Sequence, residues 1–338
     1  MPSFAFFSDF TTAQTLASGE FGFIDQEGSL EVDGDAITST GDVLISVNGF
    51  LAATSNAVAH DSNGVFLMSI GESGRVRSNN ADAIFVEEAD RAFIRNDGRI
   101  VSAFDAIDVD SGGQLTVVNN GTLVGESDGL VTDATGGSAR IVNNGVIDGL
   151  DGGIDHVGGE SLLINRGQIR EAENYGFSGD EGRDEVRNTG TILGGVFLEA
   201  GDDVVTNQGV IDRVILGIGD DVYIGRGRGS AGRVDGRDGE DFLIGSRADD
   251  VFAGGTGADT FLFGRRGGDD RILDFAGADR IVLTDFGLSG FSELRPLIEE
   301  RPNGVLIDLS DDGLTILLAD VEKADLRAND FVFELLMT

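Results

Sequence analysis

The segment Asn119-Asn-Gly-Thr-Leu123 returns 24 residues later as Asn143-Asn-Gly-Val-Ile147. Further copies of this Asn-x-Gly-x-aliphatic unit begin at Asn96, Asn165, Asn188 and Asn207. The glycines of the six copies are separated by 23, 24, 22, 23 and 19 residues, and weaker copies surround Gly28, Gly49 and Gly74. A steady period of this length is typical of a solenoid, in which each repeat packs on the next. The unit therefore predicts nine stacked coils.

Each repeat contains three short apolar segments. One follows the repeat glycine, as in Leu123, and one precedes the repeat asparagine, as in Val117. The third follows an Asp or Asn, as Ile107 follows Asp105. Short alternating runs that are interrupted by Gly, Asp and Asn are typical of strands rather than helices. Three strands in about 23 residues predict an all-β fold, a parallel β-helix.

Two polar columns accompany the strands. Stacked asparagine amides can hydrogen-bond from coil to coil. A second column is spaced by 23 residues throughout and consists of Asp82, Asp105, Asp128, Asp151 and Asn174, with Asp35 and Asn56 upstream. Such residues end strands by bonding backbone groups in turns. The alternative is a metal-binding column, because carboxylates ~5 Å apart repel by about 3 kcal/mol at an effective dielectric of 20. The asparagines within the column favour the turn interpretation.

The repeat changes near residue 184. Two residues after each turn glycine, packing residues such as Leu115 and Ala139 give way to Asp184, Asp203 and Asp221. A nine-residue period follows over 236–262, and its last copy, Gly254-Gly-Thr-Gly-Ala-Asp-Thr-Phe-Leu262, matches the calcium nonapeptide G-G-x-G-x-D-x-U-x at every defined position. Glycines let carbonyl groups turn towards an ion, and the sixth-position Asp adds a hard anionic oxygen. Residues 227–235 depart from this pattern, which predicts a defective turn or bulge.

Here the chain resembles the repeats-in-toxin (RTX) family of calcium-binding β-rolls, over about residues 179–338 and most strongly over 236–262. The resemblance implies calcium ions held between turns by the sixth-position Asp residues and neighbouring backbone carbonyls. The eighteen-residue repeat pairs Asp203 with Asp221, and Asp241 with Asp259. The implied metal-site residues are Asp184, Asp203, Asp221, Gly236, Asp238, Asp241, Gly245, Asp250, Gly254, Thr256, Asp259 and Asp270.

The C-terminal part resembles the segment that follows the β-roll in serralysin-type secreted proteins. The matching stretches are Gly268–Phe275, Asp279–Leu283 and Asn329–Phe333. The resemblance implies a cap that also serves as an uncleaved signal for the type I secretion apparatus, and therefore an extracellular or cell-surface location. The expected domains are an N-terminal cap (1–24), the β-helix (25–197), the calcium β-roll (198–263) and a C-terminal cap with the secretion signal (264–338).

Composition excludes several partners and chemistries. A net charge of −36 makes nucleic acid and anionic membranes unfavourable partners, since both require a basic surface. The absence of cysteine excludes disulfides and thiolate metal sites. No apolar run reaches the roughly 18 residues of a membrane span.

The sequence contains no motif of a protease or a lipase. Its two histidines, His60 and His156, are far apart and are expected at turns or on the surface. Neither an HExxH motif nor a GxSxG motif is present. The leading hypothesis is a secreted, non-enzymatic surface, matrix or adhesion protein that folds on extracellular calcium and binds an extracellular polysaccharide or a cell surface.

The alternative is a polysaccharide lyase or epimerase that acts on an acidic polysaccharide, because such enzymes often use β-helices and calcium. The repeat places Arg75, Arg77 and Arg99 side by side on outward positions of adjacent coils. Arginine suits bidentate recognition of carboxylates. In so acidic a chain these arginines are expected mainly as salt-bridge partners of the protein's own acids.

Overall fold

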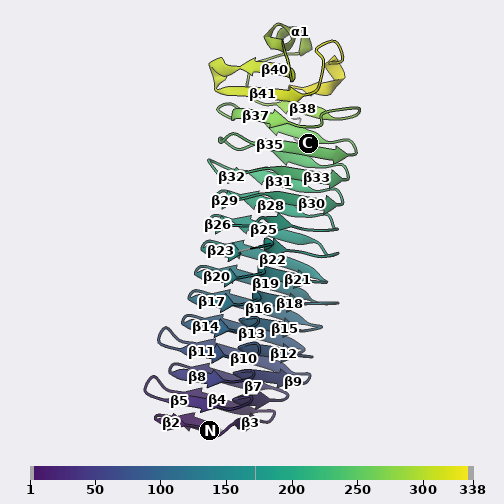
Figure 1. The fold of residues 1–338 in the computed structure, drawn as a ribbon. Helices are drawn as coiled ribbons and strands as arrows, with labels where there is room; N and C mark the ends of the chain where they lie inside the picture. The colour runs from purple at the N-terminus through teal and green to yellow at the C-terminus, as the bar shows by residue number, and fades with distance from the viewer. Residues whose placement is uncertain (1–3, 172, 334–338) are drawn as a thin grey trace. The chain divides into compact units, whose positions relative to one another are not determined.

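The computed structural model describes residues 4–171 and 173–333. These residues form strands and turns with very little helix, and they divide into two compact units. Unit 1 comprises residues 1–182 and 191–194, and unit 2 comprises residues 183–190 and 195–338. Each unit is a parallel β-solenoid, whose successive coils are labelled in Figure 1. The predicted fold class is thereby confirmed.

Unit 1 contains three parallel sheets, because each coil contributes one strand to each sheet. Sheet A contains β1 (Phe4–Phe6), β4 (Glu20–Ile24), β7 (Val43–Val47), β10 (Val65–Ile70), β13 (Arg91–Asn96), β16 (Gln114–Asn119), β19 (Ser138–Asn143) and β22 (Glu160–Asn165). Sheet B contains β2 (Asp9–Phe10), β5 (Ser29–Val32), β8 (Phe50–Ala53), β11 (Arg75–Ser78), β14 (Arg99–Ser102), β17 (Thr122–Gly125), β20 (Val146–Gly149), β23 (Gln168–Glu171) and β26 (Thr191–Ile192). Sheet C contains β3 (Gln14–Leu16), β6 (Ile37–Ser39), β9 (Val58–Asp61), β12 (Ile84–Glu87), β15 (Ile107–Asp110), β18 (Asp128–Asp133), β21 (Gly152–Val157) and β24 (Tyr175–Ser178).

The N-terminal segment expected as a cap consists of the same kind of strands. β1 and β2 pair in parallel with β4 and β5, and β3 pairs with β6, so these strands form the first coil of unit 1. Residues 1–3 of the expected cap lie outside the described residues.

Unit 2 begins with the same three sheets and then keeps two. Sheet A contains β25 (Asp184–Asn188), β28 (Val204–Asn207), β31 (Val222–Gly225), β34 (Phe242–Ile244), β36 (Thr260–Phe263), β38 (Arg280–Leu283) and β42 (Phe331–Val332). Sheet B contains β29 (Val210–Ile211) and β32 (Ser230–Ala231). Sheet C contains β27 (Val196–Phe197), β30 (Val214–Ile218), β33 (Val234–Asp238), β35 (Val251–Thr256) and β37 (Gly268–Ile272), then β41 (Leu314–Ala319), β40 (Gly304–Leu309) and β39 (Ile298–Arg301). The nine-residue period allows one strand for every half-turn, so the coil contains two strands instead of three.

The defective turn expected at residues 227–235 is wrong. β32 pairs in parallel with β29, and β33 pairs in parallel with β30. This segment is a regular coil, the last in unit 2 with a strand in sheet B. Its small residues Ser230 and Ala231 still form a strand because the neighbouring strand offers a parallel partner for their backbone groups.

The core of unit 1 is a set of stacked aliphatic columns. Val76, Ile100, Leu123, Ile147 and Ile169 occupy equivalent register positions in sheet B and are buried. Every second residue of a strand faces this core, because successive side chains point to opposite faces.

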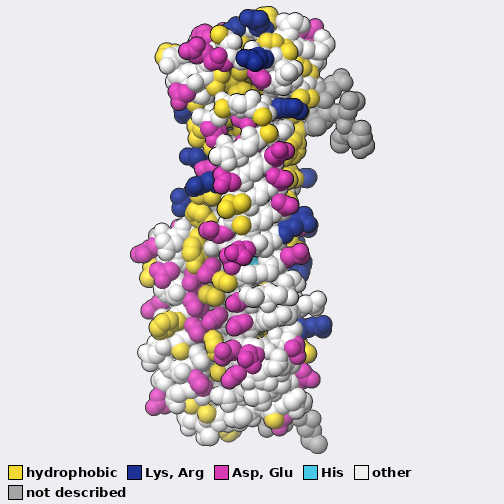
Figure 2. Space-filling model, turned by 90° about the vertical axis from the view of Figure 1, so that its right-hand side faces the viewer, with side chains coloured by type: hydrophobic (Ala, Val, Ile, Leu, Met, Phe, Trp, Pro, Cys, Tyr) yellow, Lys and Arg dark blue, Asp and Glu magenta, His cyan; other side chains and the backbone are white. Residues whose placement is uncertain are grey.

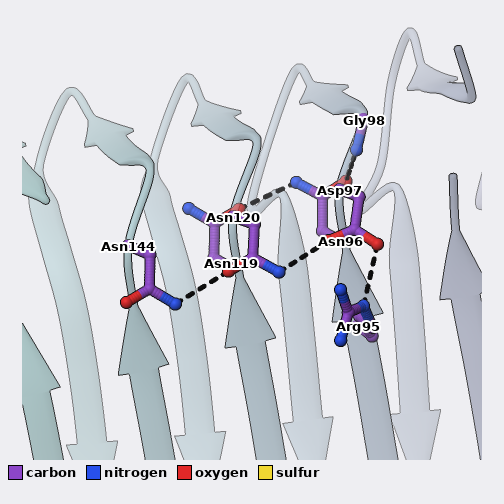
Figure 3. A network of polar contacts seen from close by, with 7 residues as sticks. All are labelled: Arg95, Asn96, Asp97, Gly98, Asn119, Asn120 and Asn144. Atoms are coloured by element: carbon purple, nitrogen blue, oxygen red, sulfur yellow. Dashed lines mark hydrogen bonds and ion pairs between the residues drawn. The ribbon is translucent and has the colours of Figure 1, made fainter. Parts of the chain in front are cut away.

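A second inward column consists of asparagine. The amide of Asn96 donates to Asn119 (2.8 Å), Asn119 donates to Asn143 (2.9 Å) and Asn143 donates to Asn165 (2.9 Å). All four side chains are fully buried, and part of the ladder is drawn in Figure 3. The predicted amide stacking is confirmed.

The two histidines are buried, so the expectation of turn or surface positions is wrong. His60 Nδ1 lies 3.1 Å from Ser39 Oγ, and His156 Nδ1 lies 2.9 Å from Thr132 Oγ1. Both occupy inward positions of sheet C strands, β9 and β21. Burial lowers the pKa of both imidazoles and so favours their neutral forms.

The C-terminal part of unit 2 changes direction. β41 continues sheet C in parallel with β37, and β40 and β39 then add antiparallel. The edge strand β39 exposes Glu299, Glu300 and Arg301, and charges at an edge discourage pairing with another chain. The short helix α1 (Phe291–Leu294) precedes it. No helix within the described ranges has the length and apolar character needed to span a bilayer.

Candidate metal centre

The turns of unit 2 bring the sixth-position aspartates into a column. The backbone N–H of each Asp donates to Oδ1 of the equivalent Asp one coil further along, at 2.7–3.1 Å. The column runs Asp184, Asp203, Asp221, Asp241, Asp259 and Asp279. On the other side, the N–H of Asp250 donates to Asp270 Oδ1 at 2.9 Å. The spatial pairs Asp203–Asp221 and Asp241–Asp259 are those that the eighteen-residue repeat predicts.

The fourth nonapeptide position explains why the turn requires glycine. Gly257 has φ 140°, a conformation that residues with a side chain rarely adopt. A Cβ atom at Gly257 would also lie 1.7 Å from the carbonyl oxygen of Gly239 in the neighbouring coil. Glycine therefore permits the close stacking that places one aspartate over the next.

The second carboxylate oxygen in these columns is buried and has no hydrogen-bond partner among the described residues. This holds for Oδ2 of Asp203, Asp221, Asp241, Asp259 and Asp270, and for Oδ1 of Asp250. A buried acceptor without a partner costs about 1–3 kcal/mol, and more when it is charged. These oxygens are therefore free to bind a cation that enters the turn.

Glycine also makes room around these oxygens. A Cβ atom at Gly254 would lie 2.1 Å from Asp259 Oδ2, and a Cβ atom at Gly236 would lie 1.9 Å from Asp241 Oδ2. A side chain at the first nonapeptide position would consequently occupy the space beside the unpartnered oxygen. The glycine at the first position of the motif is therefore needed to keep the carboxylate oxygen of the sixth-position Asp accessible.

Burial raises the pKa of the carboxyl groups that carry these unpartnered oxygens. The pKa of Asp203 and that of Asp270 rise to about 8, and that of Asp241 rises to about 7. The pKa values of Asp221, Asp250 and Asp259 rise to about 6, again chiefly because of burial. Loss of hydration disfavours the charged form, and a bound cation would favour it.

The available donors suit calcium. No three His, Asp or Glu side chains within the described ranges converge on one point, so an ion here would need backbone carbonyls beside one or two carboxylates. Calcium accepts six to eight oxygen ligands of mixed kind in flexible geometry. Zinc prefers nitrogen and sulfur ligands, and these turns offer neither.

The remaining predicted site residues lie around these turns. Asp238 and Thr256 are exposed, and Thr256 Oγ1 donates to Asp238 Oδ1 at 2.8 Å. Gly245 packs near the ring of Phe263. The next residue, Ser246, donates its N–H to Asp250 Oδ2 at 2.6 Å, which explains why Oδ1 is the unpartnered oxygen of Asp250.

The sequence did not point to two further residues of these turns, Asp279 and Asp274. Asp279 ends the main column, and its spacing of 20 residues from Asp259 repeats the spacing between Asp221 and Asp241. Asp274 accepts the N–H groups of Gly254 and Gly255, both at 3.0 Å. No repeat signal marks Asp274, because its contact arises from the stacking of coils.

The acidic column of unit 1 differs from the aspartate column of unit 2 in the partners of its carboxylate oxygens. The N–H of Asp105 donates to Asp82, and the N–H of Asp128 donates to Asp105, at 3.0 and 2.8 Å. Their other carboxylate oxygens are not buried without partners; Asp128, for example, also bonds Ser127 and Tyr175. These carboxylates bind backbone N–H groups, as the turn interpretation predicts. The N–H group that each one binds belongs to the next coil and not to the residue's own turn. Acidic side chains gather on the side of the molecule that carries β12, β15 and β18 (Figure 2).

The comparisons with known proteins give no family. No protein family and no curated protein matches the chain. A subunit of the mannuronan C5-epimerase of Azotobacter vinelandii, solved in solution, is 26% identical over 39% of this chain and 80% of its own, with a TM-score of 0.25. The extracellular lipase of Serratia marcescens is 12% identical over 78% of this chain, with a TM-score of 0.25. The match covers 45% of that lipase.

Proposed function

We propose that unit 2 binds calcium ions between its turns and that the protein is a secreted, non-enzymatic surface, matrix or adhesion protein which folds on extracellular calcium. The observation that supports the proposal is the set of buried, unpartnered carboxylate oxygens in unit 2, of which those of Asp241, Asp250 and Asp259 have the nine-residue spacing of the calcium nonapeptide. The ligands would be Asp203, Asp221, Asp241 and Asp259 on one side, and Asp250 and Asp270 on the other.

Bound calcium would supply the positive charge that these carboxylates lack. The protein's own contribution is to hold each carboxylate through the N–H of the neighbouring aspartate and to exclude water from the turn. Extracellular modules bind calcium with dissociation constants of about 10⁻⁴–10⁻³ M, well above cytosolic calcium levels. Calcium outside the cell would then complete folding after export by the segment expected over 264–338, of which residues 334–338 lie outside the described residues.

Calcium titration followed by circular dichroism tests this proposal. Strand content and melting temperature are expected to rise between EDTA and a calcium concentration about a hundredfold above a ~10⁻⁴ M site, where each site adds about 2.7 kcal/mol. Asp241→Asn should weaken the calcium response, because an amide oxygen binds the ion without a full charge. Asp105→Asn is the matched control, since Asp105 belongs to the hydrogen-bonded column of unit 1. An identical response of both variants and the unaltered chain would contradict the proposal.

The alternative function, a lyase or epimerase for an acidic polysaccharide, has one supporting feature, the arginines on sheet B of unit 1. Incubation with alginate and pectate separates the two functions. Unsaturated sugar products, or a changed uronate composition, that disappear in an Arg99→Ala variant would establish the enzyme. Intact polysaccharide after incubation agrees with the non-enzymatic function.

A further inference from the structure

Three arginines form a cluster on the outer face of sheet B in unit 1. Arg75 on β11 lies directly opposite Arg99 on β14, and Arg77 lies two residues further along β11, on the same face. They line a shallow depression of about 250 Å³ together with Phe50 and Val101. We refer to Arg75, Arg77, Arg99 and Phe50 as the arginine cluster.

The expectation that these arginines bind the protein's own acids is wrong. Within the described part of the chain, no ion pair includes Arg75, Arg77 or Arg99. Their register neighbours Phe50, Ala52, Val101 and Thr122 are uncharged. Four other arginines pair with an acid two residues away, in Arg95–Asp97, Arg187–Glu185, Arg233–Asp235 and Arg301–Glu299.

The arrangement of its charges distinguishes this cluster from exposed arginines such as Arg140, which also has no ion pair among the described residues: Arg75 and Arg99 lie directly opposite each other on adjacent strands. The chain contains 60 acidic residues and 24 basic ones, so carboxylates were available for every arginine. Like charges directly opposite each other on neighbouring strands destabilise a sheet. An anionic ligand would remove this repulsion.

We propose that the arginine cluster binds the carboxylates of a linear acidic polysaccharide. Guanidinium groups bind planar carboxylates through two parallel hydrogen bonds. Phe50, Arg75 and Arg99 succeed one another on adjacent strands about 4.8 Å apart, so they form a row that suits an extended polymer. The ring of Phe50 offers an apolar surface beside the charges, as sugar rings require.

Nucleic acid fits this surface less well. Duplex DNA has one charge per ~1.7 Å, whereas the cluster offers three cations on two coils of a chain with net charge −36. A polymer with one carboxylate per sugar matches the sparse row better. The inference extends the proposed function by naming its partner. It is independent of calcium binding, because every residue of the cluster lies in unit 1.

Isothermal titration of the full chain with short oligogalacturonate, in saturating calcium, tests the inference. The double variant Arg75→Gln/Arg99→Gln should lower the affinity at least tenfold. The Arg140→Gln variant is the matched control, because Arg140 is exposed on sheet A and its substitution changes a charge elsewhere. Added salt should weaken binding, and a neutral oligosaccharide of equal length should not bind.

Several results would overturn the inference. These are absence of binding by the unaltered chain, equal affinity of the double variant, and equal loss in the Arg140→Gln control. Equally tight binding of polyglutamate with the same number of carboxylates would assign the cluster to acidic peptides instead. A circular dichroism spectrum of each variant establishes that the fold persists. Calcium-induced folding, measured on the same samples, reports separately on unit 2.

Discussion

At the scale of single residues, the metal centre depends on the contact between a glycine and a carboxylate. The first-position glycine leaves space for the unpartnered oxygen of the sixth-position Asp, as at Gly254 and Asp259. A methyl group at this place would collide with the oxygen that a calcium ion would bind.

Gly254→Ala is therefore expected to reduce the calcium response strongly. The added Cβ would lie 2.1 Å from Asp259 Oδ2 and must displace it. The measurement is the calcium concentration at half-maximal change in circular dichroism, which should rise at least tenfold. Gly290→Ala is the control, because nothing lies within 4 Å of a Cβ at Gly290. Equal midpoints for the two variants would show that the space beside Asp259 is irrelevant.

The raised pKa values predict how the metal-free protein responds to pH. The pKa of Asp203 and of Asp270 is about 8 in the folded protein, and that of Asp241 is about 7, because of burial. The unfolded chain has ordinary values of about 4, so the folded state binds more protons between these limits. Unit 2 in EDTA should consequently lose stability as the pH rises from about 4 to about 8.

Thermal melts in EDTA and in calcium check this pH dependence. Saturating calcium should remove most of the decrease, since the ion favours the charged carboxylates. A melting temperature of unit 2 that rises with pH in EDTA would contradict the burial of these groups.

At the scale of elements, the coils of unit 1 are joined by two kinds of polar ladder. Asn96 and Asn119 of the inner ladder are fully buried, and the outer contacts of Asn120 with Asp97 and Asn144 are exposed (Figure 3). The adjacent residues Asn119 and Asn120 thus lie in different environments, the first buried and the second exposed to solvent.

Asn119→Ala should destabilise unit 1 by about 2–4 kcal/mol, because it leaves the buried amide groups of Asn96 and Asn143 with fewer partners. Asn120→Ala should change stability by no more than about 0.5 kcal/mol, as is usual for exposed substitutions. Urea unfolding of both variants measures the difference. A similar loss in both would mean that the stacked amides contribute no more than surface contacts.

At the scale of the whole molecule, calcium is expected to stabilise unit 2 and to leave the stability of unit 1 unchanged. Buried carboxylate oxygens without partners occur in unit 2 on a column of sixth-position aspartates, whereas unit 1 has none on its acidic column among the described residues and a separate one on Glu171. Calorimetry is expected to resolve two transitions, of which calcium raises the temperature of one. Limited proteolysis in EDTA should accordingly remove residues beyond about 183 first. A single transition that shifts as a whole would contradict this separation.

The sequence alone determined the coils and their register. Repeats of 22–24 residues place equivalent side chains above one another, so the columns of Ile147 and Asn143 follow from spacing. The 23-residue spacing is wrong for the acidic column beyond Asp128, because Asp128 pairs in register with Gly152 and not with Asp151. The nine-residue period likewise predicts the pair of Asp241 with Asp259, whereas Asp270 lies 20 residues from its partner Asp250 and departs from that period. Periodicity suffices for these features because a solenoid repeats one local geometry.

Only the tertiary structure decided which polar atoms find partners. Residues of neighbouring coils decide three such features: the burial of His60, the contact of Asp274 with the turn at Gly254, and the absence of ion pairs in the arginine cluster. A repeat specifies which backbone positions stack, because backbone hydrogen bonds are the same in every coil. The environment of each charge depends on the particular residues that differ between coils, and these deviations from the repeat provide the candidate functions of this protein.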